Sequence, residues 1–188
     1  MWGKVIIACL PAAVIGLALN DLAARFENAY VISAMLIVYG IAFLIVERKR
    51  PSTKYTSVDS ISFNTALLIG LFQVLSIIPG TSRSGATILG AILIGCSREI
   101  AAEFSFFLAV PVMFGVSFLK LVTYDGTITP YQWALLAVAM AVAYTVSMIA
   151  VKFLTDYVKK HDFKIFGWYR IILGIVVILV TVVIPIFA

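Results

Sequence analysis

The chain has 188 residues, of which 63% are hydrophobic and only 12% are charged, and its mean hydropathy is +1.10. A soluble globular domain is about 45–50% apolar and about 25% charged, so this chain has too little polar surface to cover a water-soluble protein. The composition excludes a soluble enzyme, a disordered chain and a nucleic-acid-binding domain, and with it a nucleic-acid partner. It predicts an all-α, polytopic membrane protein, because about 20 residues per crossing leave room for about five or six membrane segments.

Five apolar stretches predict transmembrane helices. They cover residues 4–19, 29–46, 101–121, 131–154 and 166–187. The first stretch follows Lys4 and resembles a secretory signal, but Pro11 interrupts it and no small-x-small cleavage site follows. We therefore interpret it as a retained membrane helix. Cys9 and Cys96 lie in or beside apolar runs and are interpreted as small hydrophobic residues.

Residues 61–96 predict a re-entrant helical hairpin. The segment Ile61–Ile78 is apolar, Pro79 and Gly80 end its helix, and residues 81–85 are polar. The second arm, Ala86–Gly95, is apolar again but too short to cross a bilayer. Two full crossings do not fit this length, whereas a helix that enters, turns at a polar tip inside the protein and returns to the same side does.

The distribution of basic residues supports this topology. The basic residues beside the predicted hairpin are Arg48, Lys49, Arg50, Lys54 and Arg98. Those around the loop between the last two crossings are Lys152, Lys159, Lys160, Lys164 and Arg170. The intervening connection, residues 123–131, has no basic residue. A hairpin that returns to its own side places both clusters in the cytoplasm, as the positive-inside rule requires, whereas a single crossing would not. Arg25 is the main exception.

The polar tip is the strongest functional signal in the chain. Its sequence, residues 79–87, is Pro-Gly-Thr-Ser-Arg-Ser-Gly-Ala-Thr. Non-helical backbone at membrane depth is tolerated where it is buried in protein or lines a wet cavity, and an intramembrane arginine is a functional candidate. A helix N-terminus beside a guanidinium binds anions, above all phosphate. The alternative is structural: Thr81 or Ser82 caps the helix, and Arg83 pairs with a carboxylate or reaches toward the membrane surface.

The tip string, together with Glu103-Phe104-Ser105-Phe106 and Ala109-Val110-Pro111, resembles the undecaprenyl-diphosphatase family of bacterial membrane phosphatases, also called bacitracin-resistance proteins. The resemblance covers essentially the whole chain. It implies inverted repeats, each with one re-entrant hairpin and three crossings, in the bacterial inner membrane. It also implies hydrolysis of a polyprenyl diphosphate lipid, undecaprenyl diphosphate, to the monophosphate that serves cell-wall synthesis, with a divalent cation, Mg²⁺ or Ca²⁺, as cofactor.

The resemblance assigns roles to the tip residues. Arg83 would clamp the diphosphate and neutralise charge in the transition state, while Ser82 and Thr87 would donate hydrogen bonds to phosphate oxygens. Weaker members of the same phosphate-binding cradle are Gly80, Thr81, Ser84 and Gly85. Glu103 is a candidate partner for Arg83.

One part of the family pattern is missing. Family members carry an earlier hairpin with an E-x-x-x-E motif, serines and a histidine, and the cation ligands belong there. We therefore expect an N-terminally truncated chain with no metal ligands of its own. Glu99 and Glu103 also form E-x-x-x-E, but their position just after Ser97 favours helix capping or ion pairing. His161 is interpreted as a solvated loop residue.

The expected organisation is one integral membrane domain, residues 1–188. Residues 1–60 would be the remainder of a first repeat with a cytoplasmic loop, and residues 61–188 a second repeat. Two alternatives to hydrolysis stay open. Broken helices that point N-termini at an anion also occur in transporters, so a flippase of a phosphorylated polyprenyl lipid would use the same tip. An inactive remnant would follow from the missing segment. Homo-oligomerisation is also left open.

Overall fold

The computed structural model describes residues 1–49 and 51–182, and within them the chain is all-α. Residues 183–187 of the last predicted crossing lie outside the described residues. The elements are α1 (Trp2–Arg25), α2 (Ala29–Lys49), η1 (Val58–Ser60), α3 (Phe63–Val74), η2 (Leu75–Ile77), α4 (Arg83–Ile94), α5 (Arg98–Val122), α6 (Pro130–Lys160) and α7 (Lys164–Val182).

Four helices are long and apolar enough to cross a membrane. They are Ala29–Lys49, Arg98–Val122, Pro130–Lys160 and Lys164–Thr181. Three further apolar helical segments, Trp2–Gly16, Phe63–Ile77 and Arg83–Ile94, are shorter. The four long helices coincide with four of the five stretches predicted as crossings, with bounds shifted by a few residues. The stretch predicted over residues 4–19 lies in α1, whose described apolar segment falls short of a full span.

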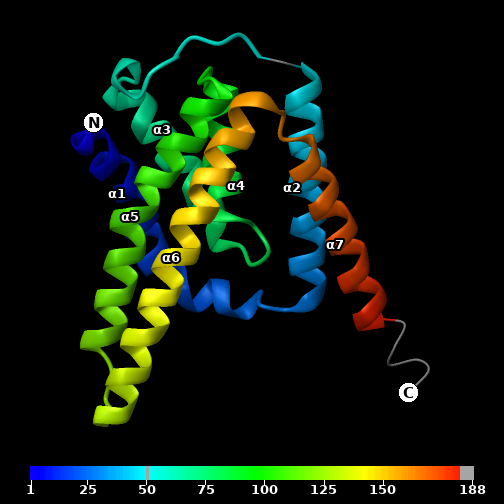
Figure 1. Cartoon of the computed structure of the whole chain (residues 1–188). Coiled ribbons are helices and arrows are strands. Elements are labelled where there is room, and N and C mark those ends of the chain that lie inside the picture. The colour runs from blue at the N-terminus through cyan, green and yellow to red at the C-terminus, as the bar shows by residue number, and fades with distance from the viewer. Residues whose placement is uncertain (50, 183–188) are drawn as a thin grey trace.

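A short helical pair, α3 and α4, lies between the longer helices, and local sequence fixes where each helix begins and ends. The Ser62 hydroxyl accepts a hydrogen bond from the Thr65 N–H at the start of α3, and Ser82 does the same for Gly85 at the start of α4. Gly95, at φ +111°, ends α4 in the left-handed conformation. Figure 1 shows the turn between the two helices at about mid-height of the molecule.

The two open ends of this hairpin are held together by the loop that precedes it. The Tyr55 N–H donates to the Gly95 carbonyl at 3.0 Å, and the Ser97 N–H donates to the Tyr55 carbonyl at 2.9 Å. The Tyr55 hydroxyl also lies 3.1 Å from Thr65 Oγ1 at the start of α3. Tyr55 therefore links the entrance and the exit of the hairpin at one level.

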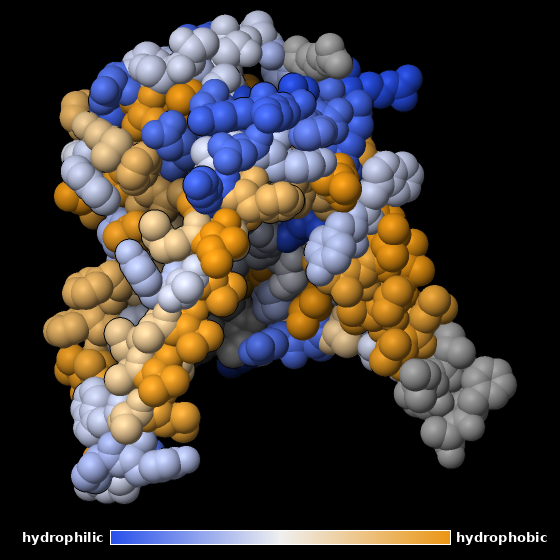
Figure 2. Space-filling view, viewed as in Figure 1, coloured by the Kyte–Doolittle hydropathy of each residue, from blue (hydrophilic) through white to orange (hydrophobic). Residues whose placement is uncertain are grey.

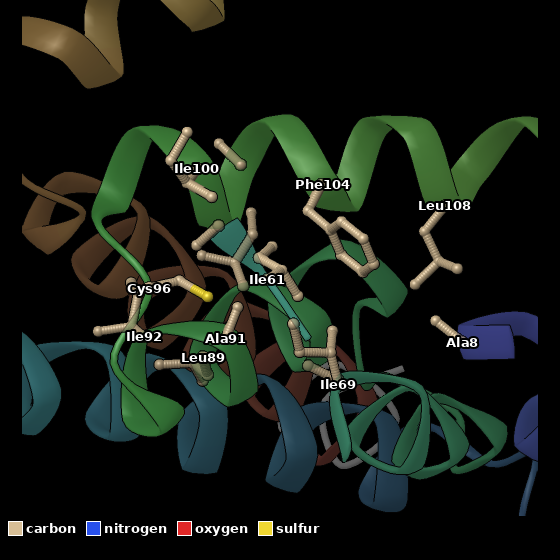
Figure 3. Close-up of a cluster of buried hydrophobic side chains, with 14 of the residues drawn as sticks. Ala8, Ile61, Ile69, Leu89, Ala91, Ile92, Cys96, Ile100, Phe104 and Leu108 are labelled. Atoms are coloured by element: carbon tan, nitrogen blue, oxygen red, sulfur yellow. The ribbon is translucent and has the colours of Figure 1, made fainter. Parts of the chain in front are cut away.

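The apolar core lies where α5 covers the hairpin. Ile100, Phe104 and Leu108 are spaced at one helical turn and form a buried face of α5. Figure 3 shows Phe104 pointing toward Ile69 and Leu108 toward Ala8 of α1, while the labelled α4 residues lie beneath Ile100. Phe104 and Ile69 are both 0% exposed. This packing fixes α4, and with it the tip, against α5.

One buried carboxylate joins three segments at the loop-rich end of the molecule. Glu47, near the end of α2, accepts the Arg98 Nε–H, which is shared between its two carboxylate oxygens at 2.9 and 3.0 Å, and pairs with the Arg98 guanidinium. It also accepts the Phe163 N–H at 3.1 Å. The ends of α2 and α6 and the start of α5 therefore share one level. Figure 2 shows hydrophilic residues gathered at this end, with apolar surface on the outer sides of the long helices.

Candidate functional site

The tip turn is shaped by a glycine that lies against another helix. Gly80 has φ +86°, a conformation that residues with a Cβ rarely adopt. A Cβ added at Gly80 would lie 2.5 Å from the Ile32 carbonyl oxygen of α2. Both observations require glycine here. The turn therefore seats closely on α2 before the chain enters α4.

Ser82 serves as the N-cap of α4, which was the structural alternative considered for it. Its Oγ accepts the Gly85 N–H at 3.1 Å and lies 3.1 Å from the Ser84 hydroxyl. The Gly85 N–H is thereby engaged within the turn. Ser82 and Ser84 remain half-buried and line the same cavity, described below.

Thr87 lies one turn into α4, and its hydroxyl is engaged in a buried network. Thr87 Oγ1 donates toward the carbonyls of Arg83, at 3.1 Å, and Ser84, at 3.0 Å, and lies 2.6 Å from the Ser105 hydroxyl of α5. Thr87 is 0% exposed. A direct bond from this hydroxyl to a phosphate would require the network to rearrange. In this geometry Thr87 ties the first turn of α4 to α5.

Arg83 and Thr81 carry buried polar atoms whose hydrogen-bonding capacity is not used within residues 1–49 and 51–182. These atoms are Arg83 Nη1 and Thr81 Oγ1. The Arg83 side chain is half-buried. A buried N–H of a guanidinium without a partner is costly, so such a group is typical of a site that receives a polar ligand. The structure thus brings Arg83, Ser82 and Thr81 together at one helix start.

The predicted pairing of Glu103 with Arg83 is absent from the described residues. On α5, Ser105 faces Thr87, and residues two positions apart on a helix point in nearly opposite directions. Glu103 therefore projects away from α4. The neighbouring Glu99 pairs with Lys159 at 3.6 Å, in line with the ion-pair interpretation.

A second arginine, Arg170 of α7, faces the tip. A cavity of about 120 Å³ is lined by Ser82, Ser84 and Gly85 from the tip, by Arg170, and by apolar side chains from α2, α5 and α6. Like Arg83, Arg170 has a buried Nη1 without a hydrogen-bond partner in the described part of the chain. From the sequence alone, Arg170 is interpreted only as one of the basic residues that set the topology. Its position six residues inside α7, rather than in the loop, is the signal that could have marked it.

A larger cavity, of about 690 Å³, lies at the loop-rich end. Most of the charges that line it are paired: Glu47 with Arg98, and Glu99 with Lys159. Asp162 also lines it, and the Lys164 ammonium, 2.8 Å away, holds the pKa of the Asp162 carboxyl below its ordinary value by hydrogen bonding. Paired charges do not select an anion. The tip, with two incompletely bonded guanidinium groups, is the better candidate site.

The fold and the tip define a class: a polytopic α-helical membrane protein with an arginine-bearing hairpin. The family model described as bacitracin resistance protein BacA matches residues 1–176. The chain belongs to this family. It is 54% identical over 185 residues to an undecaprenyl-diphosphatase from Enterococcus faecalis, covering 96% of this chain and 67% of the relative.

Other relatives agree. An undecaprenyl-diphosphatase from Lactococcus lactis subsp. cremoris (strain SK11) is 55% identical over 186 residues, which are 95% of this chain and 66% of the relative. One from Lactiplantibacillus plantarum is 51% identical over 184 residues, with 95% and 67% covered. The chain therefore spans about two thirds of the length of these relatives, and the family resemblance inferred from the tip string is confirmed.

Proposed function

We propose that this protein hydrolyses undecaprenyl diphosphate to undecaprenyl phosphate in the bacterial plasma membrane, and so returns the lipid carrier to cell-wall synthesis. The observation that carries the proposal is the α4 start, where Arg83 Nη1 and Thr81 Oγ1 are buried with unused hydrogen-bonding capacity and Arg170 faces the same turn. A diphosphate supplies the acceptor oxygens that such donors need. The names of the relatives supply the lipid.

In this proposal α3 and α4 form a re-entrant hairpin within a single membrane domain. The link made by Tyr55 between the two open ends supports a return to the side of entry. The Glu47–Arg98 pair supports it further, because it brings the end of α2 and the start of α5 to one level. That level carries the basic loops and would be cytoplasmic under the positive-inside rule. Residues 61–188 would then form one repeat, and residues 1–60 part of its partner.

The chain's own contribution to the chemistry is electrostatic. Arg83 and Arg170 would approach the diphosphate from two helices and stabilise the charge that develops on the phosphate oxygens as the anhydride bond breaks. The hydroxyls of Ser82 and Ser84, with Thr81, would complete the cradle around Gly80 and Gly85. For Thr87 the geometry favours a structural role, because its hydroxyl donates toward the Arg83 carbonyl and holds the first turn of α4.

The described residues hold no preformed site for a divalent cation. Within residues 1–49 and 51–182, no three His, Cys, Asp or Glu side chains come together in a group that could hold a metal ion. A cation expected for the family would need ligands from elsewhere in the protein.

The test is release of inorganic phosphate from undecaprenyl diphosphate by the protein in nanodiscs, together with a lipid-movement assay in vesicles. We expect phosphate release, and loss of it in Arg83→Gln. Arg25→Gln, which changes an exposed arginine at the end of α1, is the matched control and should keep wild-type turnover. Movement of the lipid across the vesicle bilayer without phosphate release would replace hydrolysis by transport. Absence of both activities would favour a remnant that retains the fold alone.

A further inference from the structure

The ring of Tyr39 lies against the guanidinium of Arg170. Arg170 Cζ is 6.0 Å from the centroid of the Tyr39 ring, within the range of a cation–π contact. Tyr39 is 8% exposed, and Arg170 lies well inside α7. Such contacts are stronger where water is excluded than at exposed sites. The pair is therefore placed where the contact has its largest effect.

Two glycines bring the pair together. A Cβ added at Gly40 of α2 would lie 2.7 Å from the Gly167 carbonyl oxygen and 2.6 Å from Ile171 Cγ1. The backbones of α2 and α7 thus touch at this level, as their side-by-side course in Figure 1 indicates. Tyr39 adjoins Gly40, and Arg170 adjoins Ile171. This close helix crossing brings the Arg170 guanidinium over the Tyr39 ring.

Helix α2 is also the helix on which the tip rests. A Cβ at Gly80 would meet the Ile32 carbonyl, and one at Gly85 would lie 3.5 Å from Cε2 of Phe43. Tyr39 lies between these two contacts along α2 and shares a face with Phe43, one turn later. Tyr39, whose ring lies against Arg170, is therefore on the helix against which the tip packs.

We infer that Tyr39 is a positioning residue, whose ring supports one face of the Arg170 guanidinium and leaves its edge free for a diphosphate at the tip. Arg170 Nη1, buried and without a hydrogen-bond partner in the described residues, is the edge that remains. A guanidinium recognises phosphate through its planar edge, so a partner that uses only its face does not compete with the ligand. This inference rests on the proposed function and adds a residue to its site.

The experiment grades the π-density of the ring without changing its shape. Position 39 of the full chain is replaced by phenylalanine and by its mono-, di- and trifluoro derivatives, since each fluorine weakens the negative face of the ring. Binding of farnesyl diphosphate, a short polyprenyl diphosphate, is measured by titration calorimetry in nanodiscs. Tyr39→Phe should bind within about twofold of wild type, and affinity should then fall stepwise by about tenfold across the series. The same series in an Arg170→Gln background should be flat.

The outcomes separate the two proposals. Binding by the unsubstituted chain that stays constant across the fluorinated series would overturn the role of Tyr39 and leave the proposed function standing. A stepwise decline that persists in Arg170→Gln would also overturn it, because the ring would then act on something else. No binding of farnesyl diphosphate by the unsubstituted chain would overturn the proposed function, and this inference with it. Equal thermal unfolding across the series shows that packing is unchanged.

Discussion

The hydrogen bond between Thr87 and Ser105 gives a sharp test of how the tip is held. Thr87→Val replaces the hydroxyl by a methyl group of similar size and leaves the Ser105 hydroxyl, 1% exposed, without its 2.6 Å partner. An unsatisfied buried hydroxyl costs about 1–3 kcal/mol, so we expect a loss of about 2 kcal/mol. Ser105→Ala should cost about 1 kcal/mol or less, because the Thr87 hydroxyl keeps its bonds to the carbonyls of Arg83 and Ser84.

The stability of the double variant relative to Thr87→Val decides the question. Thr87→Val with Ser105→Ala leaves no unpaired hydroxyl, so it should be more stable than Thr87→Val alone, by about 1 kcal/mol. The measurement is urea unfolding in detergent micelles, followed by the fluorescence of the chain's tryptophans. Thr87→Ser, which keeps the hydroxyl, is the control. A double variant that loses the sum of the two single losses would refute the argument.

The same variants separate support from direct contact. If Thr87 acts by holding the first turn of α4, farnesyl diphosphate binding should weaken in Thr87→Val by about tenfold, the scale of one lost hydrogen bond, and measurably in Ser105→Ala. If the hydroxyl bonds the phosphate directly, Ser105→Ala should bind as wild type does while Thr87→Val loses binding. The latter result would restore the direct role predicted for Thr87 from the sequence.

Further predictions concern the tip arginine, the buried carboxylate and the tip glycine. Arg83→Lys should lose most phosphate release, because a bidentate fork becomes a point charge; near-normal turnover would remove Arg83 from the mechanism. Arg98→Ala should destabilise the protein by about 3–5 kcal/mol, because it leaves the Glu47 carboxylate, whose side chain is 2% exposed, without a partner. Glu47→Gln should cost only about 1–2 kcal/mol, because the arginine that it leaves is 38% exposed and water can solvate it. Chemical unfolding that reverses this order contradicts the assignment. Gly80→Ala should destabilise the protein by more than about 2 kcal/mol, because of its φ of +86° and the contact with Ile32. Gly115→Ala, where nothing lies within 4 Å of an added Cβ, should be neutral or stabilising. Equal melting temperatures of the two variants would contradict the requirement for glycine in the tip turn.

Much of the fold followed from local sequence. Apolar runs of membrane length placed α2 and α5 to within a few residues, because a helix in lipid must satisfy its own backbone and its length is bounded by the bilayer. Pro79 and Gly80 broke the helix where expected, since both act through their own backbone. The capping role of Ser82 was visible as an alternative for the same reason.

The long-range contacts were not predictable from a single sequence. Arg170 was treated as a topogenic charge because nothing in its neighbourhood tells which helix faces it; the crossing of α2 and α7 at Gly40 decides that. The proposed Glu103 pairing failed because the register of α5 against α4 places Ser105, not Glu103, toward the tip. Sequence spacing gives the face of a helix but not its partner.

The hydrogen bonds of Tyr55 across the hairpin and the Glu47–Arg98 pair hold the loop-rich ends of α2, α4 and α5 together. A head group would then come in from the side, through the recess between α6 and α7 that Figure 2 shows, with hydrophilic surface in its depth. Entry by that route would let a long isoprenoid remain among the acyl chains while its charged end turns inward. The isoprenoid would stay in the hydrocarbon core of the bilayer, and the protein would need to enclose only the small diphosphate head group of a very large molecule.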